Sequence, residues 1–359
     1  MSKFLSRRFD TLDAYVPGDQ PSDMQYIKLN TNESPYPPAP GVISAASEGE
    51  AQKLNLYPNP DGTPLIQKLA ETYGVTPENV IIGNGSDELL AFAFLAFCDS
   101  EHPVVFPDIT YGFYPVYAEL YGIPYRQIPL KDDFTIDPAD YFDTGANVVI
   151  ANPNAPTGIA LALSDIEAIA QSNPDRVVLI DEAYVDFGAE SAVPLTHKYD
   201  NLLVMHTYSK SRSMAGARLA YAIGQQPIIE DMRKMKYSFN PYNVNRLTQV
   251  MGRAALCESG YYKEKCAEII ATRRYTAERL RKLGFWMTES SANFVFARHP
   301  KFSAFELYSA LRQKGILVRH FDKPRISDFL RITIGTRDQM DAALAAIEAI
   351  FKEAANAKK

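Results

Sequence analysis

The order of strand-like and helical segments predicts an α/β protein with a large domain, built on a mostly parallel sheet flanked by helices, and a smaller α+β domain. Two observations lead to this prediction. Short apolar runs alternate with stretches of helical length between residues 64 and 223, and repeated strand–helix units are typical of a parallel sheet with helices on both faces. A long amphipathic stretch then ends the alternation, and a shorter set of strand-like and helical segments follows it.

The elements of the large domain follow from local composition. The expected strands are short, mostly β-branched apolar runs, the pattern of a strand that is buried on both faces. The expected helices are longer stretches between these runs. We expect strands at 80–82, 103–106, 147–151, 177–181, 202–206 and 219–223, and helices at 64–73, 86–97, 112–121 and 164–172.

The C-terminal part begins with a long amphipathic helix, expected at 262–283, that leads out of the large domain. Beyond it we expect strands at 293–297 and 330–334 and helices at 304–314 and 337–354. The Pro-rich 34–40 segment favours an extended arm or linker. We therefore predict an N-terminal arm with part of the small domain at 1–40, the large domain at 41–250 and the small C-terminal domain at 251–359.

Lys210 lies in a segment whose spacing indicates covalent cofactor chemistry. In HTYSKSRSMAGAR (206–218), Ser209 precedes the lysine and Arg218 follows it by eight residues. A lysine amine can form a Schiff base with the aldehyde of pyridoxal phosphate, while a serine hydroxyl and an arginine guanidinium can bind its phosphate. Because the same spacing also occurs in solvated loops, the interpretation depends on three other segments.

Two of these segments are buried strands that run into polar residues. The strand at 177–180 ends at Asp181, with Tyr184 three residues further on. Ligands bind at the carboxyl ends of strands in open α/β sheets, where a carboxylate can pair with a protonated pyridine nitrogen and a tyrosine can meet the ring 3-oxygen. The alternative is an Asp-Glu pair that caps a helix. The strand at 148–151 enters the loop NPNAPTG (152–158), whose asparagines could donate to the ring oxygen or form an ordinary turn.

The third segment is VIIGNGSDELL (80–90), in which a strand enters a loop of small residues and a helix leaves it. Gly85 permits close backbone approach, and the free amides at the start of the helix favour a phosphate. Alone, this pattern is also compatible with any tight turn followed by an acidic first helical turn.

In this order, the segments resemble those of fold type I pyridoxal-phosphate aminotransferases, and more closely the histidinol-phosphate aminotransferase family. The resemblance extends from about Tyr15 to Arg337. It includes four further motifs: LNTNESPY (29–36), YPNPDG (57–62), TYGFY (110–114) and FLRITIGT (329–336). The ordered set is specific for the superfamily and less specific for the substrate.

The resemblance implies roles at the cofactor, pyridoxal 5'-phosphate. Three side chains would be catalytic: Lys210 as the Schiff-base lysine, Asp181 at the pyridine nitrogen and Tyr184 at the 3-oxygen. Tyr111 would stack on the ring. The phosphate would be held by Gly85, Ser86, Asp87, Ser209 and Arg218.

The resemblance also implies a substrate pocket that two chains share. Arg331 would hold the substrate carboxylate, with Arg319 and Tyr15 also on the substrate side. Tyr57 would reach the phosphate of the neighbouring subunit, so the chain is expected to form a homodimer. One position departs from the family: an asparagine that usually precedes Pro-Thr-Gly is Ala155 here. We expect Asn154 to take over its contact with the ring oxygen, the alternative being that Tyr184 alone supplies the donor.

Composition excludes several other classes of function. The net charge of −6 gives no basic footprint for nucleic acid. The start, MSKFLSRR, lacks the apolar core of a signal peptide, and the longest apolar run, 89–97, is too short to cross a membrane. The three cysteines lack paired spacing, and the histidines show no ligand spacing, so we expect reduced thiols, no metal and a cytoplasmic enzyme acting on small molecules.

Three functions remain open. The first is amino transfer between glutamate and imidazole acetol phosphate, which yields histidinol phosphate in L-histidine biosynthesis. An aromatic or broad-range aminotransferase is the neighbouring alternative within the same class. The second is a threonine-phosphate decarboxylase, which would use the same scaffold to cleave a carboxylate. The third is a non-catalytic domain of a transcription regulator, which would need a DNA-binding segment for which there is no room before Leu29.

Overall fold

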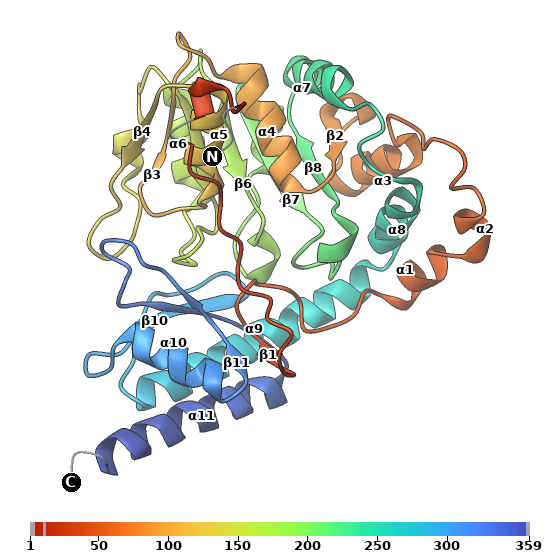
Figure 1. Cartoon of the computed structure of the whole chain (residues 1–359). Coiled ribbons are helices and arrows are strands. Elements are labelled where there is room, and N and C mark those ends of the chain that lie inside the picture. The colour runs from red at the N-terminus through yellow and green to blue at the C-terminus, as the bar shows by residue number, and fades with distance from the viewer. Residues whose placement is uncertain (1–3, 10–11, 357–359) are drawn as a thin grey trace.

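A seven-stranded sheet forms the centre of the large part of the chain (Figure 1). The computed structural model describes residues 4–9 and 12–356. The strand order is β2-β8-β7-β6-β5-β3-β4, and β8 runs antiparallel to both of its neighbours while the other pairs are parallel. The strands are β2 (Val80–Gly83), β3 (Val104–Pro107), β4 (Tyr125–Ile128), β5 (Asn147–Ala151), β6 (Val178–Asp181), β7 (Leu202–Thr207) and β8 (Ala220–Ile223).

Helices cover both faces of this sheet because alternate strand residues point into two separate cores. Val148 and Ile150 face the core shared with α3, α6 and α8, whereas Val149 between them faces the core shared with α4, α5 and α7. The helices are α1 (Pro40–Ala45), α2 (Glu48–Ala51), α3 (Thr63–Tyr73), α4 (Ser86–Phe97), α5 (Phe113–Tyr121), α6 (Leu163–Ser172), α7 (Gln226–Phe239) and α8 (Arg246–Cys257). The predicted α/β class with a mostly parallel sheet is confirmed.

The smaller part has a four-stranded antiparallel sheet, β12-β13-β10-β9, and a separate parallel pair, β1-β11. Its strands are β1 (Ile27–Lys28), β9 (Trp286–Met287), β10 (Phe294–Arg298), β11 (Ile316–Leu317), β12 (Arg319–His320) and β13 (Leu330–Thr333). Its helices are α10 (Ala304–Gln313), α11 (Arg337–Asn356) and most of α9 (Ser259–Lys282). Because Leu29 packs in this core, the N-terminal segment belongs to it as well.

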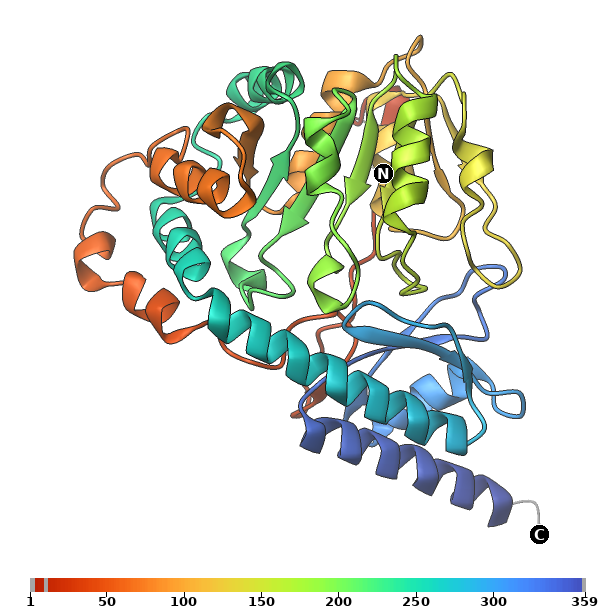
Figure 2. The same ribbon diagram turned by 180° about the vertical axis from the view of Figure 1, so that it is seen from behind.

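The two parts are joined by α9, which Figure 2 shows running the whole way from one to the other. Its start packs in the core of the large part through Tyr262, and its later turns pack in the small core through Ile269 and Leu280. The predicted boundary at 250 falls within α8, which packs against α1 and α3 of the large part. No helix of the described residues is apolar over a length that would cross a bilayer.

Among the elements of the large part that were not expected from the sequence are α1, α2, α7, α8 and the edge strand β4. Edge strand β4 exposes Tyr125, Arg126 and Gln127, so it lacks the apolar run that marks the central strands. Helix α7 does carry a helical signal, since Ile228, Ile229 and Met232 share its buried face. Helix α8 likewise buries Gly252, Ala255 and Leu256.

Candidate active site

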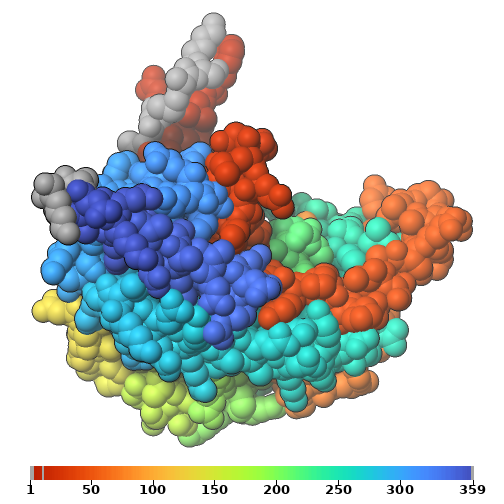
Figure 3. Space-filling view, turned by 90° about the horizontal axis from the view of Figure 1, so that it is seen from below, coloured from red at the N-terminus to blue at the C-terminus, as the bar shows by residue number. Residues whose placement is uncertain are grey.

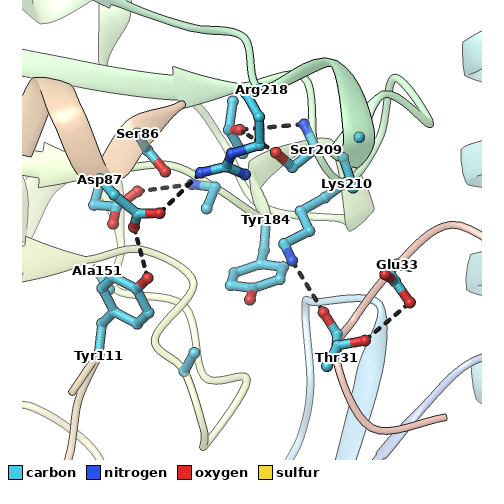
Figure 4. A pocket seen from close by; sticks show the side chains of 16 residues that line it. Thr31, Glu33, Ser86, Asp87, Tyr111, Ala151, Tyr184, Ser209, Lys210 and Arg218 are labelled. Atoms are coloured by element: carbon cyan, nitrogen blue, oxygen red, sulfur yellow. Dashed lines mark hydrogen bonds and ion pairs between the residues drawn. The ribbon is translucent and has the colours of Figure 1, made fainter. Parts of the chain in front are cut away.

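A cavity of about 330 Å³ opens at the carboxyl edge of the large sheet (Figure 4). Loops that follow β2, β3, β5, β6 and β7 meet there with the turn before β8 and with the N-terminal segment. The lining residues are Thr31, Glu33, Ser86, Asp87, Tyr111, Ala151, Ala155, Asp181, Ala183, Tyr184, Thr207, Ser209, Lys210, Ala215, Gly216 and Arg218. The structure thus brings together motifs that lie far apart in the sequence.

Lys210 lies three residues beyond the end of β7, and its side chain extends into the cavity. Its Nζ donates a hydrogen bond to the backbone carbonyl of Thr31 at 3.1 Å. Burial, and next the positive charge of Arg331, lower the pKa of Lys210 to about 8. An amine with this pKa is partly unprotonated near neutral pH, as a nucleophile or general base requires.

Asp181 is the last residue of β6 and is 5% exposed. Its carboxylate accepts hydrogen bonds from the Tyr114 hydroxyl and the Ala183 amide, both at 3.2 Å. Burial raises the pKa of Asp181 to about 6, and among the described residues no basic side chain forms an ion pair with it. A buried carboxylate in this state lacks a cation, and a protonated ring nitrogen supplies one.

The segment between β2 and α4 forms a cradle closed by Arg218. Gly85 has φ +84°, and a Cβ at this position would overlap the Arg218 guanidinium, so only glycine fits here. Ser86 begins α4, whose first amides have no partners within the helix. The Arg218 Nη2 lies 2.9 Å from Asp87 Oδ2, and the Ser209 hydroxyl faces the same cavity. Amides, hydroxyls and a guanidinium around one space are the donors that a phosphate needs.

Tyr111 and Tyr184 lie on different walls of the cavity (Figure 4). The Tyr111 hydroxyl donates to Asp87 Oδ1 at 2.7 Å, which fixes its ring beside the cradle. The Tyr184 hydroxyl accepts a hydrogen bond from Asn32 Nδ2 at 2.9 Å. Two tyrosines held by side-chain hydrogen bonds are suited to contact the face and the edge of a flat ring.

The three residues predicted on the substrate side form a second group beside the cavity. The Arg331 Nη2 donates to the Asn30 carbonyl at 3.1 Å, while its Nε is buried without a partner. Arg319 donates to the carbonyls of Val16 and Pro17, both at 3.3 Å. Burial raises the pKa of the Tyr15 hydroxyl, and the positive charges of Arg331 and Arg319 offset only part of this rise.

Tyr15 connects this group to the cavity. Its ring centroid lies 6.1 Å from that of Tyr111, which lines the cavity, and 4.2 Å from that of Phe113, on which it stacks. No acid in the described part of the chain forms an ion pair with Arg331. The Arg331 guanidinium is therefore open to an anion from outside.

Asn154 is not brought to the cavity. Its amide nitrogen donates to the Ile109 carbonyl at 2.9 Å and to Thr157 Oγ1 at 3.1 Å, and its Oδ1 accepts from Thr110 at 2.8 Å. With its amide used inside the loop, Asn154 is not placed to replace the missing asparagine, contrary to our expectation. Ala155 lines the cavity instead, and Tyr184 is the neighbouring hydroxyl donor.

Tyr57 also lies apart from the cavity of its own chain. Its side chain is 77% exposed and stacks on Tyr242 with a centroid distance of 4.4 Å. Among the residues at the site for which no role was predicted are Thr31, Glu33, Asn32 and Tyr114. Thr31, Asn32 and Glu33 belong to the motif at 29–36, and Tyr114 belongs to the motif at 110–114. Both motifs were recognised in the sequence, but the sequence did not show which side chains these residues contact.

The comparisons with known proteins agree with this geometry. Residues 24–347 match the family Aminotransferase class I and II, and the chain is a member of that class of enzymes. It is 51% identical over 353 residues to the histidinol-phosphate aminotransferase of Marinomonas sp., covering 98% of this chain and 100% of the relative. The chain belongs to the histidinol-phosphate aminotransferase family and depends on pyridoxal phosphate.

Further relatives give the same result. A histidinol-phosphate aminotransferase from Brachyspira hyodysenteriae is 48% identical over 353 residues, with 98% of this chain and 100% of the relative covered. The crystal structure of histidinol-phosphate aminotransferase from Sinorhizobium meliloti in complex with pyridoxal-5'-phosphate superposes with a TM-score of 0.84 at 25% identity, and covers 92% of each chain.

The side chains of the cavity fit pyridoxal phosphate. Asp181 is a buried carboxylate without a cation, the Gly85 cradle leaves amides and a guanidinium for a phosphate, and Lys210 offers an amine between them. These three features match the ring nitrogen, the phosphate and the aldehyde of the cofactor.

Proposed function

We propose that the protein transfers the amino group between histidinol phosphate and 2-oxoglutarate, a step of L-histidine biosynthesis. The names of its relatives support this substrate pair. The observation that carries the proposal is Arg331, whose guanidinium has a buried Nε without a partner and no ion pair in the described chain. A planar guanidinium can make two parallel hydrogen bonds to the carboxylate of glutamate or to a phosphate.

On this proposal the chain holds the cofactor by its ring and by its phosphate. Asp181 faces the ring nitrogen, Tyr184 donates to the ring 3-oxygen and Tyr111 covers the ring face. The α4 N-terminus, Ser209 and Arg218 hold the phosphate. When bound, pyridoxal phosphate supplies an electron-withdrawing ring that stabilises the negative charge left on the substrate α-carbon.

Lys210 has two proposed tasks. Its amine would bind the cofactor aldehyde, and the same amine would accept the proton from the substrate α-carbon. The pKa of about 8, lowered by burial and by Arg331, keeps a usable fraction of the amine unprotonated near neutral pH. Asp181 stays charged when it faces a protonated ring nitrogen, because a buried opposite charge stabilises its ionised form.

We also propose that the enzyme is a homodimer whose sites are shared. The segment with α1 and α2 projects from the body of the chain, in orange at the right of Figure 3. Its apolar side chains are exposed, with Leu54 and Leu56 each at 57%, and Phe239 is exposed at 74%. Tyr57 already lies apart from the cavity of its own chain. A second copy that covers these exposed side chains would bring its own cavity close to Tyr57.

The dimer is tested by sedimentation at assay concentrations. We expect a dimer of the wild-type chain, and a Tyr57→Ala variant that stays dimeric but binds the cofactor more weakly. A fully active monomer would rule the proposal out.

The three cysteines form no disulfide, and burial raises the pKa of Cys98 and of Cys266 to about 12. Such unreactive thiols are compatible with the cytoplasmic location that we propose.

The substrate is tested by single half-reactions. Holoenzyme is mixed separately with glutamate, histidinol phosphate, phenylalanine and threonine phosphate, and the loss of the absorbance band of the lysine-bound cofactor is followed. We expect conversion by glutamate and histidinol phosphate. Conversion by phenylalanine but not by histidinol phosphate would favour an aromatic aminotransferase. The stacked rings of Tyr15 and Phe113 could also contact an aromatic substrate.

A further inference from the structure

Asn32 lies directly behind Tyr184 and has no role in the proposal above. It is 1% exposed, and its backbone has φ +57°, in the left-handed region where asparagine is one of the few side chains tolerated. Every polar atom of Asn32 has a partner on another segment of the chain. A buried residue in this backbone conformation, with all of its polar atoms used, has a fixed orientation.

Thr333 of β13 determines which way the Asn32 amide points. The Asn32 backbone N–H donates to Thr333 Oγ1 at 3.0 Å, and the Thr333 hydroxyl donates to Asn32 Oδ1 at 3.0 Å. The opposite amide orientation would leave the hydroxyl hydrogen of Thr333 without an acceptor at a position that is 2% exposed. Because buried polar groups are satisfied, the amide oxygen faces Thr333 and the amide nitrogen faces Tyr184.

This orientation fixes the direction of the Tyr184 hydrogen bond. Asn32 Nδ2 is a donor, so the Tyr184 oxygen accepts at 2.9 Å and its own hydrogen is free to point elsewhere. Tyr184 lines the cavity, and burial raises its pKa, so the hydroxyl keeps that hydrogen. The remaining direction for the O–H is into the cavity.

We propose that Asn32 is a positioning residue that turns Tyr184 into a hydrogen-bond donor toward the cofactor and links it to the strand that carries the substrate arginine. The inference rests on the proposed contact between Tyr184 and the ring oxygen. Asn32 acts through Tyr184 and touches neither substrate nor cofactor.

The neighbours of Asn32 support the link to the substrate side. The Asn30 carbonyl accepts from Arg331 at 3.1 Å, and the Thr31 carbonyl accepts from Lys210 at 3.1 Å. Three successive residues therefore contact the substrate arginine, the cofactor lysine and the cofactor tyrosine. Thr333 lies two residues from Arg331 on β13, so the Thr333–Asn32 pair sets the position of that strand relative to Tyr184.

The test uses Asn32→Asp, which keeps the shape and exchanges the amide donor for an acceptor. The carboxylate introduced by this substitution would accept the Tyr184 hydrogen, and the ring oxygen would lose its donor. The negative charge of the ring oxygen would then be less stabilised, so the pKa of the lysine-bound cofactor chromophore should rise by about 0.5 units or more, the scale of one hydrogen bond. The readout is a pH titration of holoenzyme absorbance, which is independent of turnover.

Tyr184→Phe separates the hydrogen bond from the added charge. Asn32→Asp should shift the chromophore pKa by about 0.5 units more in the wild-type background than in the Tyr184→Phe background, because only the hydroxyl can be diverted. An equal shift in both backgrounds, or no shift at all, would overturn the inference. If Tyr184→Phe by itself leaves the chromophore pKa unchanged, the proposed contact of Tyr184 fails, and the inference fails with it.

Two further variants keep the test valid if Asn32→Asp does not fold. Thr333→Val removes the hydroxyl with little change in shape, and Thr333→Ser retains it. We expect Thr333→Val to raise the chromophore pKa only in the presence of Tyr184, and Thr333→Ser to stay near the wild-type value. Equal behaviour of the valine and serine variants would overturn the role assigned to the Asn32–Thr333 pair.

Discussion

Arg331→Lys is the substitution that tests the substrate side most sharply, because it keeps the charge and removes the planar fork. In the structure one arm of the guanidinium donates to the Asn30 carbonyl and the Nε is buried without a partner. A lysine can still meet an anion, but it cannot make two parallel hydrogen bonds. Losing one hydrogen bond to a charged group costs about 1.5–3 kcal/mol, which corresponds to a rise in KM of roughly tenfold to a hundredfold.

The stability of the variant separates binding from structure. An arginine in a structural ion pair would leave an unpaired buried acid when replaced, and the free energy of unfolding would fall by several kcal/mol. Arg331 has no such acid in the described chain, so we expect the melting temperature of Arg331→Lys to stay near that of the wild type.

The assay is steady-state kinetics with both substrates, and Arg325→Lys is the matched control. Arg325 pairs with Asp108 at 2.8 Å and donates to the Leu130 and Lys131 carbonyls, so its guanidinium already has partners and this change should leave both KM values unaltered. Arg331→Lys should raise KM for glutamate and for histidinol phosphate together. An effect on glutamate alone would place the phosphate elsewhere, with Arg319 as the next candidate, and no effect on either would refute the reasoning.

Three further predictions concern the cofactor. Borohydride reduction and peptide mapping should place the pyridoxyl label on Lys210, and a label on Lys236 would contradict the assignment. Because burial raises the pKa of Asp181 to about 6, the apoprotein loses stability as pH rises from about 4 to 6. Asp181→Asn should remove this loss, on the order of 2–3 kcal/mol, while lowering turnover about a hundredfold or more, and unaltered turnover would speak against its role. Gly85→Ala should weaken cofactor binding to the apoprotein by about tenfold or more, measured by fluorescence titration, because its Cβ would displace Arg218; an unchanged affinity would be incompatible with the cradle.

The central strands and their polar ends were predictable from the sequence because burial on both faces demands apolar runs. Asp181 ends such a run, and Lys210 and Arg218 lie in the connection between β7 and β8. Their meeting at one edge follows from the parallel β6–β7 pair and the antiparallel β7–β8 pair. Strand β4 could not be found in the same way, since an exposed edge strand has no such requirement.

The contacts between side chains that lie far apart in the sequence could not be predicted. Asn154 stands next to the expected position, yet hydrogen bonds to Thr110 and Ile109 turn its amide into the loop. Asn32 was only one residue of a motif in the sequence, and its proposed task depends on a hydrogen bond from Thr333, 301 residues away. Such side-chain hydrogen bonds depend on three-dimensional placement that residue spacing alone does not specify.

The most direct test of the account is full turnover with histidinol phosphate and 2-oxoglutarate. We predict that purified holoenzyme forms one glutamate for each histidinol phosphate consumed, with the parallel double-reciprocal lines of a two-step transfer. We further predict that kcat/KM for histidinol phosphate exceeds that for phenylalanine by about tenfold or more, since a phosphate offers more charge and more acceptor oxygens to Arg331 and the neighbouring Arg319 than a carboxylate does. Glutamate formation from phenylalanine but not from histidinol phosphate would contradict the proposed function.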